Sequence, residues 1–174
     1  MEEKVIMSSQ FLTFMLDDSQ YAVEVYNVQE VMEYTRITKM PCADPWMEGL
    51  ISSRGKGISV INLRKKFALP DKEPDKETRI IVMEMKPSED SLITFGAIAD
   101  SVQEVIDIDK SEIEPPPKFG NNISGKFIHG IGKKDGNFII ILNINQIFSA
   151  DEIINLSEVT KSLNEAAEAE QENG

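Results

Sequence analysis

Short apolar runs separated by turn-forming residues recur along the whole chain. Residues 11–16 are apolar, residues 17–20 are polar, and residues 21–25 alternate between apolar and polar side chains. Alternation with a period of two is typical of a half-buried β-strand, so these segments predict a β-hairpin. The three hairpins predicted in this way cover residues 11–25, 79–99 and 127–142, the last around the turn dipeptide Asp135-Gly136.

A fourth hairpin is predicted within residues 49–67, G-L-I-S-S-R-G-K-G-I-S-V-I-N-L-R-K-K-F. Glycines on either side of Lys56 suit a tight reversal, since glycine adopts positive φ angles without a steric penalty. The reversal places Arg54 on an exposed tip between two strands. Apolar residues of the second strand and of the segment after it are assigned to the core: Val60, Ile61, Leu63 and Phe67.

Helical patterns are concentrated at the C-terminal end. Ser149 and Glu152 have the spacing of a capping box. Apolar residues then follow at helical intervals: Ile153, Leu156, Val159, Leu163 and Ala167. We therefore expect a helix from about residue 150 that frays into the acidic end. With about ten short strands and few helical segments, the chain is predicted to be all-β and built from small barrels.

A weak internal repeat divides the chain into two halves. The tetrapeptide V-Q-E-V occurs at residues 28–31 and again at 102–105, and a glycine-bounded hairpin follows each copy. The return strands also match, with S-V-I-N-L-R-K-K-F at 59–67 and I-I-L-N-I-N-Q-I-F at 140–148. Such a period exceeds that of solenoid repeats and indicates a duplicated subdomain. Two packed subdomains leave a seam, which is a preferred position for a binding site.

These patterns predict a flexible N-terminus at residues 1–8, a duplicated domain at 9–150 with its seam near 70–85, and an acidic helix or disordered tail at 151–174. The tail carries seven acidic residues and one lysine, which supplies half of the net charge of −12. A chain with this balance lacks the basic face that nucleic acids need. The local basic run Arg64-Lys65-Lys66 is interpreted as a solvated strand end or loop.

The composition is that of an ordinary globular protein, with 41% hydrophobic and 28% charged residues. No apolar run approaches the ~18 residues of a membrane helix. The acidic N-terminus does not have the pattern of a signal peptide. We therefore predict a cytoplasmic protein that does not insert into a membrane. The single cysteine, Cys42, excludes an intramolecular disulfide and a multi-cysteine metal site.

Residues suited to catalysis or to holding a cofactor are scarce. The one histidine, His129, lies in an apolar segment, and neither it nor Cys42 has a recognisable partner in the sequence. The segment Gly55-Lys56-Gly57 lacks the spacing of a phosphate-binding loop. The acidic pairs of the chain lack the spacing of a calcium loop. We therefore predict a non-enzymatic binding protein that uses no cofactor and no metal.

The order of several motifs resembles the CheW family, the coupling proteins of bacterial chemotaxis. The matching runs are F-L-T-F-M-L-D-D-S-Q-Y-A-V-E-V-Y-N-V-Q-E-V, P-W-M-E-G-L-I-S-S-R-G-K-G-I-S-V-I-N-L-R-K-K-F, G-A-I-A-D-S-V-Q-E-V and I-E-P-P-P, all within residues 10–150. The resemblance implies two packed five-stranded SH3-like β-barrels, to which the C-terminal helix predicted above is added. It also implies a non-catalytic adaptor that couples chemoreceptor signalling tips to the regulatory domain of the histidine kinase CheA, at membrane-associated receptor arrays.

The resemblance further implies a surface that binds receptor and kinase. Arg54 and Gly55 match the arginine and glycine of the family motif N-L-R-G. Residues that match other positions of that surface are Val28, Glu30, Gly49, Val102 and Val105. The chain departs from the family at Ser52-Ser53, where Asn-Leu is usual, and at Gly57, where a bulkier residue is usual. We expect partner choice or affinity to differ as a result.

Two other functions compete with this interpretation. A small-barrel nucleic-acid-binding protein would use the basic run 64–66 beside Phe67, but the acidic balance argues against it. An enzyme would need to use Cys42 or His129, for which the sequence shows no constellation. Individual site residues also have two interpretations. Val28, Val102 and Val105 are interpreted either as core residues or as partner contacts, and Glu30 either as a solvated charge or as a partner contact.

Overall fold

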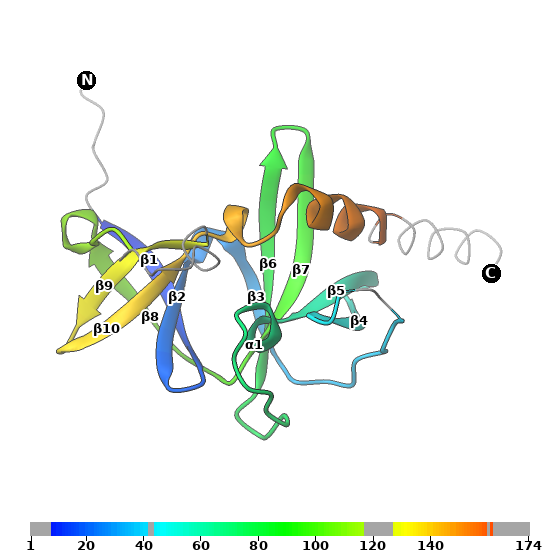
Figure 1. Cartoon of the computed structure of the whole chain (residues 1–174), viewed down its shortest axis with the longest axis horizontal. Helices are drawn as coiled ribbons and strands as arrows, with labels where there is room; N and C mark the ends of the chain where they lie inside the picture. Colours follow the sequence, from blue (N-terminus) through cyan, green and yellow to red (C-terminus); the bar gives the residue numbers. More distant parts are fainter. Residues whose placement is uncertain (1–7, 42–43, 117–126, 160, 162–174) are drawn as a thin grey trace.

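The computed structural model describes residues 8–41, 44–116, 127–159 and 161 (Figure 1). Ten strands run through these residues: β1 (Ser8–Leu16), β2 (Ser19–Glu24), β3 (Val28–Glu33), β4 (Met47–Ser53), β5 (Lys56–Asn62), β6 (Arg79–Ser88), β7 (Ser91–Ala99), β8 (Ser101–Asp109), β9 (Ile128–Lys134) and β10 (Asn137–Leu142). Short helical segments join them: η1 (Val25–Asn27), α1 (Leu63–Lys66), η2 (Lys110–Glu112) and η3 (Ile144–Gln146), with a C-terminal helix at 150–159. Of the N-terminus predicted to be flexible at 1–8, Ser8 is the first residue of β1, and residues 1–7 lie outside the described residues. Cys42 and the end of the acidic tail at 162–174 lie outside them as well.

The strands form two five-stranded mixed sheets that share one topology. The first sheet has the order β8-β1-β2-β10-β9, and the second has the order β3-β6-β7-β5-β4. In each sheet a central antiparallel hairpin is joined on one side by a parallel strand, β10 beside β2 and β5 beside β7. Figure 1 shows the first sheet on the left and the second in the centre and on the right. The prediction of an all-β chain with two five-stranded subdomains is confirmed.

Each sheet contains one copy of the sequence repeat and is completed by one further hairpin. β1 and β2 join β8, β9 and β10, whereas β6 and β7 join β3, β4 and β5. The chain therefore changes sheet between β2 and β3 and again between β7 and β8. This arrangement corrects the predicted seam near 70–85, because that segment connects β5 to β6 within the second sheet. A hydrophobic pattern shows that a strand is buried but not which strand it pairs with, so the pattern does not show that β1 and β2 join the second copy of the repeat.

Matching residues of the repeat make the same backbone contacts. The backbone N–H of Asn62 donates to the Trp46 carbonyl at 2.7 Å, and that of Asn143 donates to the Phe127 carbonyl at 2.8 Å. Each asparagine side chain then accepts a backbone N–H of the turn that follows, at 3.1 Å in both halves. Asparagine suits this position because its side-chain oxygen caps the first turn of a helix. The two halves therefore fold alike even where their sequences differ.

Both sheets curl until their two edge strands approach each other. In the second sheet, Ser53 of β4 donates to Glu30 of β3 at 2.8 Å, although these strands stand at opposite ends of the sheet order. In the first sheet, Lys134 of β9 lies 3.7 Å from Glu104 of β8, again across the two edges. Each glutamate comes from one of the V-Q-E-V segments. Polar side chains thus bridge the open side of each small barrel.

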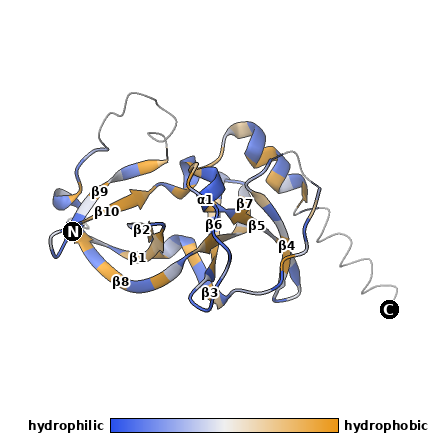
Figure 2. Cartoon of the chain, turned by 60° about the horizontal axis from the view of Figure 1, so that its bottom comes forward, coloured by the Kyte–Doolittle hydropathy of each residue, from blue (hydrophilic) through white to orange (hydrophobic). Residues whose placement is uncertain are grey.

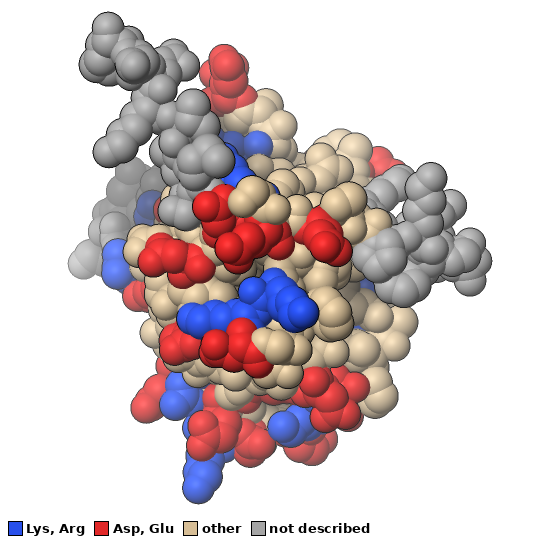
Figure 3. Space-filling view, turned by 90° about the vertical axis from the view of Figure 1, so that its left-hand side faces the viewer, with Lys and Arg blue, Asp and Glu red and all other residues tan. Residues whose placement is uncertain are grey.

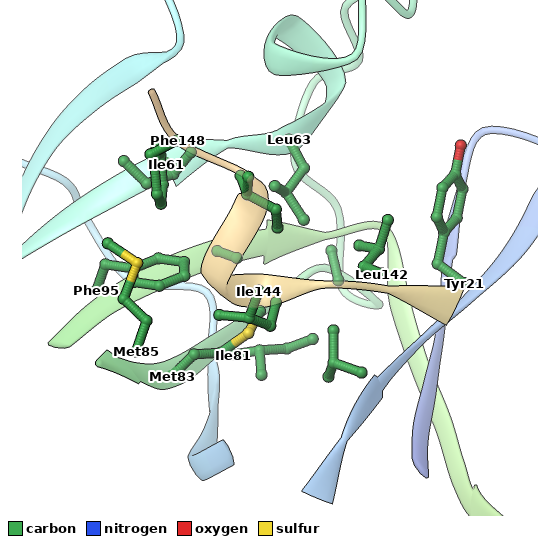
Figure 4. Packing of buried hydrophobic residues seen from close by; sticks show 14 of the residues in the cluster. Tyr21, Ile61, Leu63, Ile81, Met83, Met85, Phe95, Leu142, Ile144 and Phe148 are labelled. Carbon is green, nitrogen blue, oxygen red and sulfur yellow. The ribbon is translucent and has the colours of Figure 1, made fainter. Parts of the chain in front are cut away.

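The main hydrophobic core lies between the two sheets, as Figure 4 shows. Tyr21 and Leu142 reach it from the first sheet, and Ile81 and Phe95 reach it from the second. A smaller buried cluster lies within each sheet. Because most of the large buried side chains belong to the shared cluster, neither subdomain has a substantial core of its own.

Apolar and polar residues alternate along the strands, as Figure 2 shows for β8. The sequence assigns four apolar residues of the 49–67 stretch to the core. Val60, Ile61 and Leu63 are fully buried, and Phe67 packs against the main core. The core prediction for this stretch is confirmed.

The C-terminal helix begins with the predicted capping box. The backbone N–H of Ser149 donates to Oε1 of Glu152 at 2.8 Å, and the N–H of Glu152 donates to Oγ of Ser149 at 3.2 Å. Leu156 is buried in the main core, and Ile153 and Val159 pack against it. The apolar stripe therefore docks this helix on the domain. The last two residues of the predicted stripe lie outside the described residues.

Candidate functional site

Arg54 stands at the tip of the hairpin between β4 and β5. Arg54 and Gly55 both have positive φ angles, +54° and +79°. Two successive positive φ angles are the geometry of a type I′ turn, which favours glycine at the second position. This region costs a residue with a side chain about 1–2 kcal/mol, and asparagine or aspartate enters it more readily than arginine. The equivalent tip between β9 and β10 carries Asp135-Gly136 instead, with the same signs of φ.

Glu30 of β3 holds the Arg54 side chain. Arg54 Nη2 lies 3.3 Å from Oε2 of Glu30, while Ser53 Oγ donates to Oε1 of the same carboxylate at 2.8 Å. The Arg54 side chain is 75% exposed and that of Glu30 is 29% exposed. An exposed ion pair of this kind contributes only about 0–1 kcal/mol to stability. The contact therefore orients the guanidinium more than it stabilises the fold, and it brings two predicted site residues, Arg54 and Glu30, together.

A groove of about 340 Å³ opens beside Arg54. Ile58 and the exposed Leu92 of β7 supply its apolar part. Arg54 and Lys56 place two cations beside it, on a chain whose net charge is −12. Its other lining residues are Gln29, Ser53, Gly57 and Thr94. Sequence reasoning missed Leu92 as a site residue, because it was counted as an ordinary strand position; its place directly after a polar turn was the available signal.

The three valines of the predicted surface fall into two kinds. Val28 and Val102 are half-buried and pack against the main core, so the structure gives both a packing role. Val105 is 51% exposed on β8, an edge strand of the first sheet. An exposed apolar residue on an edge strand offers contact area where a second chain can approach. The structure does not bring Val102 or Val105 to the Arg54 tip, because they belong to the other sheet.

Gly49 shapes the hairpin that carries Arg54. A Cβ atom at Gly49 would lie only 2.1 Å from the carbonyl oxygen of Thr38. Thr38 and Leu50 exchange two backbone hydrogen bonds of 2.9 Å, which place the preceding segment across β4. Gly49 is therefore required by this close backbone approach.

The basic run after β5 is engaged in ion pairs. The three pairs are Arg64 with Asp100 at 2.6 Å, Lys65 with Glu48 at 3.1 Å and Lys66 with Glu152 at 2.6 Å. The Arg64 and Lys66 side chains are each only 10% exposed, so their interpretation as solvated charges is wrong. Hydrogen bonding to Asp100 raises the pKa of Arg64. Because these cations already have carboxylate partners, the nucleic-acid alternative loses the residues on which it depended.

Figure 3 shows the side of the molecule that carries the first sheet. Acidic residues lie on both sides of one short basic band there. A nucleic-acid-binding protein needs a continuous basic face, and this side does not provide one.

Groups suited to metal binding do not gather at one place in the described part of the chain. In the part of the chain that the structure describes, no three histidine, cysteine or carboxylate side chains stand close enough together to hold a metal ion. His129 is exposed on β9. Within the same described residues, no helix has the length and apolar character needed to cross a bilayer.

Comparison with known proteins identifies the fold. Residues 10–152 match the CheW-like domain family. The chemotaxis protein CheW of Thermotoga maritima is 33% identical over 139 residues, covering 78% of this chain and 85% of that protein. The chemotaxis protein CheW of Bacillus subtilis is 28% identical over 151 residues, covering 87% of this chain and 94% of that protein. The crystal structure of the scaffolding protein TtCheW from Thermoanaerobacter tengcongensis matches with a TM-score of 0.74 at 34% identity, over 87% of this chain and 95% of that one.

Two packed small barrels that present an arginine tip define an interaction scaffold. The chain belongs to the CheW family: it is a chemotaxis scaffolding and coupling protein, and a non-catalytic adaptor. The resemblance stated from the sequence motifs is thereby confirmed. Membership of this family implies partners within a chemotaxis signalling complex.

Proposed function

We propose that this chain joins the signalling tips of methyl-accepting chemotaxis receptors to the regulatory domain of the histidine kinase CheA. Its place is in the cytoplasm, at membrane-associated receptor arrays. Arg54 is the central partner contact, and Gly55 and Glu30 fix its position. Membership of the CheW family supports the kind of partner, and the geometry of the β4–β5 tip supports the residue.

The observation that carries the proposal is the strained and exposed Arg54. Folding alone gives no reason for an arginine here, since aspartate or asparagine would adopt the same φ with less strain. Backbone strain that persists at an exposed position is a feature of functional sites. Arginine can donate forked hydrogen bonds to a carboxylate, and it is common among the residues that dominate interface energies.

The other predicted residues have supporting roles in this proposal. Val105 supplies exposed apolar contact area on the first barrel. Val28 and Val102 support the β3 and β8 edges from the core side. Gly49 allows the hairpin to take its shape. Partner contact would therefore involve two separate patches, one on each barrel.

Reconstitution with the kinase regulatory domain and a receptor signalling-tip fragment tests the proposal. We expect the full-length chain to bind the kinase domain and Arg54→Glu to weaken binding by about thirtyfold or more, the loss typical of a central interface residue. Affinity would be measured by titration calorimetry, and kinase output would be measured with and without the chain.

Lys133→Glu provides a matched control, because it makes the same charge change on the equivalent hairpin of the first barrel. We expect it to retain most of the affinity. Equal retention by wild type and Arg54→Glu would remove Arg54 from the kinase surface, and failure of the wild-type chain to bind either fragment would overturn the proposed function.

A further inference from the structure

Ser53 and Arg54 share one carboxylate, although they are neighbours in sequence and the carboxylate comes from another strand. Ser53 Oγ donates to Oε1 of Glu30 at 2.8 Å, and Arg54 Nη2 donates to Oε2 at 3.3 Å. The Ser53 contact is the shorter of the two, and it is partly buried, whereas the Arg54 contact is exposed. The serine hydroxyl therefore fixes one oxygen of Glu30 and leaves the other one facing the guanidinium.

The first barrel shows what happens when the equivalent residue is a cation. The sequence repeat places Lys134 at the position of Ser53, and Asp135 at the position of Arg54. Lys134 pairs directly with Glu104, the counterpart of Glu30, at 3.7 Å. In that barrel the residue before the tip forms the ion pair with the glutamate. In the second barrel the short, uncharged Ser53 leaves the charge of Glu30 available to Arg54.

The guanidinium of Arg54 has more hydrogen-bond donors than its contact with Glu30 uses. Arginine carries five N–H groups in a fixed fork. Among the described residues, Glu30 accepts the hydrogen bond that the Arg54 guanidinium donates. The structure gives the other N–H groups of Arg54 no hydrogen-bond partner among the described residues, and this side chain is 75% exposed. A carboxylate is the group that such a fork binds with two parallel hydrogen bonds.

We propose that Ser53 is a positioning residue for Arg54, and that the guanidinium held in this way binds a carboxylate of the partner. This inference rests on the proposed function, since it assumes that Arg54 meets the partner. Ser53 acts through Glu30: its hydroxyl restricts the carboxylate to one rotamer, and the carboxylate restricts Arg54. Pre-organisation of this kind raises affinity because less side-chain entropy is lost on binding.

Full-length variants at position 53 test the inference, with the kinase regulatory domain as the binding probe. We expect Ser53→Ala to weaken binding by about three- to tenfold, the effect of one hydrogen bond. Ser53→Thr keeps the hydroxyl and should retain the affinity of the wild type. Ser53→Lys should weaken binding as well, because its ammonium competes with Arg54 for Glu30, as Lys134 binds Glu104 in the first barrel. Melting temperatures of all variants would be recorded to separate binding from folding.

A double-mutant cycle separates positioning from a merely structural role. In a Glu30→Ala background, Ser53→Ala should cause no further loss, because the residue through which it acts is gone. Raising the salt concentration should weaken binding by the wild type more steeply than by Arg54→Ala, if the partner group is a carboxylate. Equal salt dependence of the two would overturn the carboxylate assignment.

Failure of this inference can be told apart from failure of the proposed function. If Arg54→Ala loses affinity but Ser53→Ala does not, the role of Ser53 is discarded and the Arg54 contact stands. The same holds if Ser53→Thr loses as much as Ser53→Ala. If Arg54→Ala binds like the wild type, the proposed contact itself is overturned.

Discussion

Arg64 and Asp100 form a buried, two-pronged ion pair where the chain crosses between the sheets. Nε and Nη2 of Arg64 donate to Oδ1 and Oδ2 of Asp100 at 2.9 and 2.6 Å, and the two side chains are 10% and 12% exposed. Asp100 also accepts the backbone N–H of Asp17, in the turn between β1 and β2, at 2.8 Å. A single carboxylate thus links α1, which follows β5 of the second sheet, to the central hairpin of the first sheet.

Loss of the Asp100 carboxylate should strongly destabilise the fold. We expect Asp100→Ala to lower the free energy of unfolding by about 3–5 kcal/mol, because it leaves a buried guanidinium without its partner. Urea unfolding followed by circular dichroism at pH 7 measures this. Lys72→Ala, which removes an exposed pair with Asp75, serves as the control and should cost less than about 1 kcal/mol. Similar small losses in both variants would contradict the joining role of Asp100.

The free energy of unfolding should decrease as the pH is lowered into the acid range. Burial by itself would raise the pKa of Asp100, but the hydrogen bonds from Arg64 and from the Asp17 N–H outweigh burial and hold that pKa below its ordinary 3.8. A carboxyl whose folded-state pKa is depressed contributes its full stability above the unfolded pKa and loses it as pH falls through the folded pKa. Burial would also raise the pKa of Glu152, but the hydrogen bonds from Lys66 and from the Ser149 N–H together outweigh burial and hold that pKa below its ordinary 4.5.

We therefore expect the urea midpoint to drop as the pH is lowered from neutrality to below about 4, where unfolded carboxyls begin to bind protons. Asp100→Asn should start lower at neutral pH and show a flatter acid limb, because it has no proton to gain. Parallel pH profiles for wild type and Asp100→Asn would show that other carboxyls govern the acid limb.

Lys66 should control the docking of the C-terminal helix. Its ammonium lies 2.6 Å from Glu152 of that helix and 4.4 Å from the centre of the Trp46 ring. Lys66→Ala removes both the ion pair and the cation–π contact, so we expect the helix to loosen and the buried Trp46 to meet water. Trp46 is the only tryptophan of the chain, which makes its fluorescence a direct measurement.

The expected result for Lys66→Ala is a red shift of the emission maximum and a lower unfolding free energy. Asp151→Asn is the matched control, since it changes an exposed charge of the same helix without touching Trp46. An unshifted emission maximum in Lys66→Ala would mean that apolar packing by residues such as Leu156 suffices to hold the helix.

Two glycines of the β4–β5 hairpin should tolerate alanine very differently. At Gly49 a Cβ would lie 2.1 Å from the Thr38 carbonyl oxygen, whereas at Gly55 it would meet nothing within 4 Å. We expect Gly49→Ala to cost more than about 3 kcal/mol or to prevent folding, because backbone must move. Gly55→Ala should cost only about 1 kcal/mol, the price of its positive φ. Thermal unfolding of both variants checks the order, and a reversed order would contradict the close approach at Gly49.

Much of the fold could be predicted from the sequence, because the strands, hairpins and helix start depend on local patterns. Hydrophobic patterning identified most of the strands, Asp135-Gly136 identified a hairpin, and the capping box of Ser149 and Glu152 identified the start of the last helix. Each of these signals acts over a few residues, and the physical cause lies in backbone sterics or in the burial of one face.

The candidate site could be predicted only in part from such local sequence patterns. Arg54 could be placed on a tip because glycine follows it. Its contact with Glu30 could not, because it forms across the two edges of a curled sheet. Leu92 reaches the same groove from another hairpin, and its place after a polar turn indicates exposure but not proximity to Arg54.

The sequence by itself determined the strands, the duplication, the apolar core of residues 58–63 and the exposed arginine tip, since these follow from patterns that each segment carries alone. The tertiary structure decided three other matters: which strands share a sheet, which of the basic residues are buried, and which carboxylate orients Arg54. Strand pairing and ion pairing depend on energies between segments far apart in the chain. Arg64 shows the difference most clearly. Its neighbours in the sequence predict an exposed side chain, whereas the fold brings Asp100 close and Arg64 forms a buried ion pair with it.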